Sequence, residues 1–169
     1  MDFIDKNLAP LLNEGGGVTF LASNISVYSE IAENAFREMK ELEEAGCIPR
    51  PDGDGYIKLY DPQRKSFKAA LVHIVFAGIW LDARLHLEIV ERFSKTKAGK
   101  YDKCSYEDKL ELLDALDEGL KVRLAHFRDI RRELVHEKAY FHQNTIYVAQ
   151  QEARGVRELM QDISNRLAG

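Results

Sequence analysis

The stretch LKVRLAHFRDIRRELVH, Leu120–His136, decides the fold. It contains no proline, and its apolar residues recur at intervals of three and four: Leu120, Leu124, Phe127, Ile130 and Leu134. At about 100° per residue, these side chains fall within a sector of roughly 120° on a helical wheel. The pattern therefore predicts an amphipathic helix that packs one face against other helices.

Arg131 interrupts this apolar stripe. On the same wheel it lies between Leu120 and Leu124, where an unpaired charge would cost several kcal/mol or more. The guanidinium must therefore reach solvent or find a partner. His136 follows five residues later, near the expected end of the helix. Arg131 and His136 are the first candidates for functional residues.

Other segments of the chain show the same helical periodicity. Gly46 is expected to end the first of them, and Ser105 with Asp108 forms a capping box that starts the third. The expected helices span 19–45, 63–95, 105–116 and 145–167, in addition to 120–136. The sequence thus predicts an all-α fold, a helical bundle of four to five main helices in one domain, 1–169.

Two segments depart from the helical pattern. Residues 1–18 are expected to form a flexible or short helical arm, interrupted at Pro10 and followed by consecutive glycines. The segment Ile48–Pro62 is rich in Pro and Asp-Gly pairs, which predicts a loop with a short strand or hairpin at 56–60.

Composition limits the functional classes. The 169-residue chain has a net charge of −4, so any contact with nucleic acid has to come from a local basic patch. Its two cysteines fit neither a zinc site nor a redox motif. The N-terminus lacks the features of a signal peptide, and the apolar run Ala69–Leu81 is too short to span a bilayer. We expect a cytoplasmic protein with no membrane partner.

The segment FRDIRRELVH, Phe127–His136, contains an Arg-x4-His motif on the next-to-last long helix, followed by a turn and a final helix. In this it resembles the HEPN superfamily of small helical domains, and the order of helices is loosely similar over 19–167. The resemblance implies a homodimer in which two copies of the motif meet at one cleft. It also implies a metal-independent endoribonuclease without cofactors, such as a toxin or defence component with a cognate antitoxin protein.

The resemblance makes Arg131 and His136 the catalytic pair. RNA can be cleaved when its own 2′-OH attacks the adjacent phosphorus, and a histidine near neutral pKa can transfer the proton. A fixed arginine can stabilise the charge that develops on the phosphoryl oxygens. Arg128 and Arg132 lie on one stripe with His136, so we expect them to bind the RNA substrate or a nucleotide.

The alternative within the same resemblance is a non-catalytic module that binds RNA or assembles with another protein. The position after the motif arginine is often Asn, Asp or His in the family, and Arg132 occupies it here. This difference favours the binding module.

Purely structural interpretations also exist for each residue. Arg128 and Arg132 could be solvated and paired with Asp129, Glu133 or Glu137. Arg131 could be bonded to helix-end carbonyls or to a carboxylate such as Asp82 or Glu88, and His136 could favour the negative end of its helix. For His73, His86 and Trp80 the simplest expectation is a place in the core or at its boundary.

A di-iron bundle is a further alternative, because Glu133-Leu-Val-His136 has the Glu-x-x-His spacing of helical metal ligands. Such a site needs a second Glu-x-x-His pair, and no other histidine in the chain has a glutamate three residues before it. The sequence therefore favours a site without metal.

Overall fold

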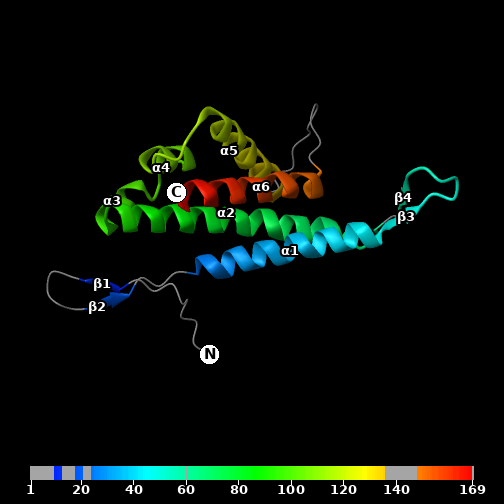
Figure 1. The fold of residues 1–169 in the computed structure, drawn as a ribbon, viewed down its shortest axis with the longest axis horizontal. Helices are drawn as coiled ribbons and strands as arrows, with labels where there is room; N and C mark the ends of the chain where they lie inside the picture. The colour runs from blue at the N-terminus through cyan, green and yellow to red at the C-terminus, as the bar shows by residue number, and fades with distance from the viewer. Residues whose placement is uncertain (1–9, 13–17, 21–23, 60, 136–147, 169) are drawn as a thin grey trace.

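A computed structural model describes residues 10–12, 18–20, 24–59, 61–135 and 148–168 of the chain. Within these residues the fold is a helical bundle with four long helices (Figure 1). They are α1 (Ile25–Ala45), α2 (Lys65–Arg92), α5 (Glu118–Ile130) and α6 (Ala149–Ala168). Two seven-residue helices, α3 (Lys95–Tyr101) and α4 (Tyr106–Leu112), connect α2 to α5. The predicted all-α bundle with four to five main helices is confirmed.

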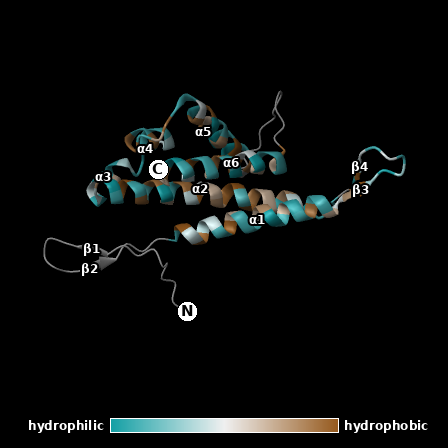
Figure 2. Cartoon of the chain, viewed as in Figure 1, coloured by the Kyte–Doolittle hydropathy of each residue, from teal (hydrophilic) through white to brown (hydrophobic). Residues whose placement is uncertain are grey.

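The 28-residue helix α2 is the centre of the bundle. It packs against α1, α6, α3 and α4, and α1 runs beside it in the opposite direction (Figure 1). Apolar residues gather along α2 (Figure 2), and its fully buried side chains include Ile74, Leu81, Leu85 and Ile89. By length and composition α2 could cross a membrane, yet half of its most apolar window is buried inside the bundle.

Helix α5 forms because its apolar stripe covers this core. Leu120, Leu124, Phe127 and Ile130 are all buried, as the periodicity predicts. Asp117 caps the helix, since its carboxylate accepts a hydrogen bond of 2.7 Å from the backbone N–H of Leu120. At its C-terminal end the α-helix continues into one wider π-helical turn, η1 (Arg131–Val135), which packs against α2.

Two short antiparallel hairpins flank α1. Strand β1 (Pro10–Leu12) pairs with β2 (Val18–Phe20), and β3 (Cys47–Pro49) pairs with β4 (Tyr56–Lys58). The strand expected at 56–60 is confirmed for residues 56–58, which form β4. The described part of the predicted N-terminal arm, Pro10–Leu12 with Val18, is strand rather than helix.

Two predicted helix boundaries are wrong. The first helix begins at Ile25 instead of at Thr19, because Val18–Phe20 pairs with β1. The third ends at Leu112 instead of at Leu116, although its capping box is present as expected. Asp114 takes a left-handed conformation with φ 54°, which turns the chain toward the cap of α5.

The expectations for core residues hold for two of the three. Trp80 is buried, and His73 is fully buried with its Nδ1–H donating to the carbonyl oxygen of Ala32 over 2.8 Å. His86 is instead exposed, with its ring 3.9 Å from the carboxylate of Asp102. It lies on an exposed face of α2.

Candidate functional site

A groove of about 390 Å³ lies beside η1, and we call it the arginine groove. Its lining residues come from α2, the turn before α4, the start of α4, α5 and η1: Asp82, Cys104, Ser105, Tyr106, Arg128, Arg131 and Arg132. The structure thus brings the three predicted site arginines together at one place. His136, the fourth predicted site residue, lies outside the described residues.

Arg131 is the first residue of η1, directly after α5. Its guanidinium packs against the Phe127 ring and against the backbone of α2. Its Cζ atom is 5.8 Å from the centroid of the Phe127 ring. A β-carbon built on Gly78 of α2 would lie 2.6 Å from the same atom, so the guanidinium rests directly on the backbone of α2. An arginine in the apolar stripe is therefore accommodated by a glycine on the facing helix.

One hydrogen bond fixes the end of the Arg131 side chain. Nη1 donates to the phenolic oxygen of Tyr106 over 2.6 Å, and the Tyr106 hydroxyl donates to Oδ2 of Asp82 over 3.2 Å. Among the described residues Nε is buried without a partner. Nη2 makes no hydrogen bond within the same residues, and Arg131 is only partly buried and lines the groove.

Tyr106 stays protonated at neutral pH. Burial raises its pKa to about 12, and the carboxylate of Asp82 contributes to the rise while Arg131 opposes it. The phenol therefore has one proton to donate and lone pairs to offer, which matches its two partners.

Asp82 has a cationic partner of its own in Lys109. Nζ of Lys109 lies 3.5 Å from Oδ1 of Asp82, and the Lys109 side chain is only 5% exposed. Since this lysine is buried in α4 and Asp82 is the carboxylate it pairs with among the described residues, Asp82 is balanced by Lys109 rather than by Arg131.

Arg131 differs from the other partly buried arginines. Each of those forms an ion pair with a carboxylate: Arg84, Arg123, Arg157 and Arg166. In the part of the chain that the structure describes, Arg131 has no carboxylate within ion-pair distance and is bonded to a neutral phenol instead. Among the described residues, its positive charge thus has no negative charge in contact with it.

Arg128 and Arg132 do have acidic partners. Arg128 pairs with Glu107 of α4. Arg132 is 59% exposed and lies 3.2 Å from Asp129 and 3.7 Å from Glu133, which is the solvated pairing expected as a structural alternative. Both side chains line the groove while part of their charge is screened.

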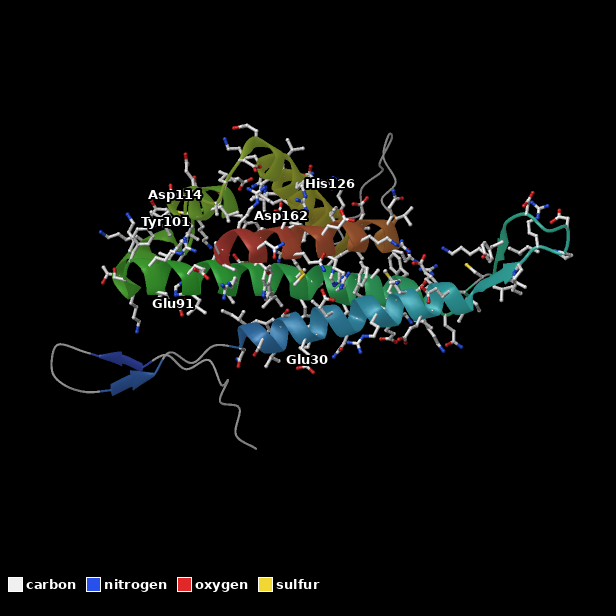
Figure 3. All side chains as sticks on the ribbon, viewed as in Figure 1. Glu30, Glu91, Tyr101, Asp114, His126 and Asp162 are labelled. Atoms are coloured by element: carbon white, nitrogen blue, oxygen red, sulfur yellow. The ribbon has the colours of Figure 1, made fainter. Side chains whose placement is uncertain are left out.

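The opposite flank of α5 is built differently. There Nη1 of Arg123 donates to Asp162 over 2.6 Å, and the ring of His126 lies 2.8 Å from Glu152 (Figure 3). Both pairs join α5 to α6, so Arg123 and His126 on this flank each lie against a carboxylate. Among the described ranges, no group of three or more His, Cys, Asp or Glu residues is placed to hold a metal ion.

Sequence reasoning missed Tyr106 and Gly78. Tyr106 is the first residue of α4 after the Ser105 cap, where an aromatic residue is usually assigned to packing alone. Gly78 interrupts the most apolar helix in the chain, and such a glycine often marks a close approach of backbone or side chain. The sequence also proposed Asp82 as a direct partner of Arg131, whereas the structure places Tyr106 between them.

Comparison with protein-family models, with curated proteins and with solved structures finds no match to this chain.

Proposed function

We propose that this chain is a HEPN-like, metal-independent endoribonuclease that acts as a homodimer, with Arg131 and His136 as the catalytic residues. The observation that carries the proposal is the state of Arg131: partly buried, held by a neutral oxygen, without a carboxylate in contact among the described residues, and lining a groove with two further arginines. A positive charge of this kind suits an anionic ligand such as an RNA phosphate.

The chemistry follows from the two residue types. In the proposed reaction the 2′-OH of RNA attacks the adjacent phosphorus, and the bond to the 5′-oxygen of the next nucleotide breaks. His136 accepts the proton of the 2′-OH, an imidazolium gives a proton to the departing 5′-oxygen, and Arg131 stabilises the charge on the phosphoryl oxygens. Arg128 and Arg132 would contact neighbouring phosphates from the rim of the groove.

A dimer is part of this proposal, because one chain supplies a single Arg131–His136 pair. Two copies around a two-fold axis would bring two such pairs to one cleft. The proposal also implies a cytoplasmic protein whose activity a cognate antitoxin would restrain.

The test is RNA cleavage in EDTA by the wild-type protein, by His136→Ala and by the control His126→Ala, which removes a histidine paired with Glu152 on the other flank of α5. We expect cleavage by the wild type and the control, and a loss of about 10²- to 10⁴-fold in His136→Ala. Equal cleavage by wild type and His136→Ala, or none by the wild type, contradicts the enzymatic proposal.

One observation favours the non-catalytic alternative, a module that binds RNA or nucleotides or assembles with a protein. Arg128 and Arg132 already have the carboxylate partners Glu107, Asp129 and Glu133, which weakens the groove as a binding site for a transition state. Binding of RNA by the wild type without cleavage, lost in Arg131→Gln, would select this alternative.

A further inference from the structure

We propose that Tyr106 is the positioning residue for Arg131. Its phenolic oxygen, which carries no charge, accepts a hydrogen bond from the guanidinium, so that the positive charge of the arginine remains available to a phosphoryl oxygen of the substrate. This inference rests on the proposed function and deepens it, since it names the residue that makes the arginine available.

The first step is the direction of the two hydrogen bonds at Tyr106. A guanidinium can only donate, so Nη1 of Arg131 donates to the phenolic oxygen over 2.6 Å. The single proton of the phenol is then free for Oδ2 of Asp82, at 3.2 Å. Arg131 can only donate and the Asp82 carboxylate can only accept, so both hydrogen bonds at Tyr106 have a fixed direction, from Arg131 to Tyr106 and from Tyr106 to Asp82.

The second step is the charge of the partner. Had a carboxylate held Arg131, as Asp162 holds Arg123 on the same helix, the ion pair would have offset the positive charge. The phenol gives the same geometric constraint without a negative charge. Asp82, one bond further away, is balanced by the buried Lys109 at 3.5 Å.

The third step is the packing that leaves one donor group accessible. The Phe127 ring, 5.8 Å from Cζ, and the backbone at Gly78 limit the other directions in which the guanidinium could move. Tyr106 also stacks on Phe127, with ring centroids 6.4 Å apart. Tyr106 and Phe127 therefore act together, and Nη2, which makes no hydrogen bond among the described residues, is the nitrogen that we assign to an anion in the groove.

The test compares Tyr106→Phe, which removes the oxygen and keeps the ring, with the control Tyr101→Phe on α3 (Figure 3). Two quantities are measured: the affinity for inorganic phosphate by calorimetry, and kcat and KM for RNA cleavage. We expect Tyr106→Phe to keep its fold, to bind phosphate at least about fivefold more weakly, and to lose about 10- to 100-fold in kcat with little change in KM. Tyr101→Phe should match the wild type in both.

Asp82→Asn is the second variant: its side chain is half exposed, and the amide keeps an oxygen in place of the one that lies 3.5 Å from Nζ of Lys109, so we expect some loss of stability but a folded protein. It weakens the acceptor that orients the Tyr106 hydroxyl, and we expect a several-fold loss in phosphate affinity and in kcat. If Tyr106→Phe does not fold, this variant decides the inference. Wild-type phosphate affinity and kcat in Tyr106→Phe, or in Asp82→Asn when only that variant folds, would overturn it.

The two readouts separate this inference from the proposed function. If the wild type binds phosphate but cleaves no RNA, the endoribonuclease proposal fails, and phosphate affinity in Tyr106→Phe still decides the role of Tyr106. If the wild type does not bind phosphate, the charge of Arg131 is not available to an anion, and the positioning role is overturned.

Discussion

Gly78 and Arg131 fit together so closely that no other residue type could stand at position 78 without moving the arginine. A β-carbon there would lie 2.6 Å from Cζ and 2.8 Å from Nε and Nη1 of Arg131. Glycine inside a helix costs about 1 kcal/mol relative to alanine. The middle of α2 thus carries a destabilising residue at the point where the guanidinium of Arg131 crosses it.

Gly78→Ala is expected to separate stability from function. The flexible end of Arg131 can swing away from the new methyl group, so the free energy of unfolding should stay within about 1 kcal/mol of the wild type. The displaced guanidinium should lose its bond to Tyr106, and RNA cleavage should fall about 10- to 100-fold. Urea denaturation and cleavage kinetics measure the two effects.

The matched control is Gly155→Ala in α6, where an added β-carbon meets nothing within 4 Å. It should stabilise the protein by about 0.5–1 kcal/mol and leave cleavage unchanged. Wild-type cleavage by Gly78→Ala would show that the contact between Gly78 and Arg131 has no part in the site.

Acid should destabilise the bundle through His73. Burial lowers the pKa of His73 from 6.5, while Glu33 of α1 raises it and Arg157 of α6 lowers it further. Below pH 6.5 the unfolded chain therefore binds a proton that the folded chain does not. The contribution of His73 to stability is complete above that pH and decreases as the pH falls toward the lowered pKa of the folded state.

Urea denaturation at pH 7.5 and at pH 5 checks this expectation. His73→Gln should lose less stability between the two conditions than the wild type, because its side chain does not titrate. His86→Gln, which replaces an exposed histidine, should show the pH dependence of the wild type. A wild-type pH dependence in His73→Gln would rule out this histidine as its source.

Arg92 should stabilise the bundle by joining three helix ends. Its guanidinium donates to Glu88 over 3.1 Å, to the carbonyl oxygen of Leu113 over 3.3 Å and to that of Leu167 over 2.8 Å. We expect Arg92→Ala to lower the free energy of unfolding by about 1–3 kcal/mol, since it leaves helix-end carbonyls without a donor.

Arg50→Ala is the control for Arg92→Ala, because it breaks an exposed pair with Asp52 and should cost about 0.5 kcal/mol or less. Urea midpoints measure both. Equal losses in the two variants would contradict a special role for Arg92.

The helices were predictable because their apolar residues repeat over many turns. In α5 four buried residues share one face, so a single irregular position could not obscure the period. Strand β1 has only three residues, Pro10–Leu12, and pairs across a run of glycines with β2. So few residues give too little alternation to be distinguished from a loop.

The candidate site was predictable only in part. Arg131 was recognisable because a charge in an apolar stripe violates the pattern around it. Its partners were not, since the bond to Tyr106 joins residues 25 positions apart and the contact with Gly78 joins two different helices. Helical periodicity says which face of a helix is buried but not which residues of two helices meet.

The most direct test of the central claim compares Arg131, the first residue of η1, with Arg123 of α5 in an RNA cleavage assay with EDTA. Arg131→Gln removes the arginine held by a neutral phenol, and Arg123→Gln removes one held by Asp162. We predict a loss of about 10²- to 10³-fold for Arg131→Gln and wild-type cleavage for Arg123→Gln. Wild-type cleavage by Arg131→Gln, or an equal loss in both variants, would contradict the account.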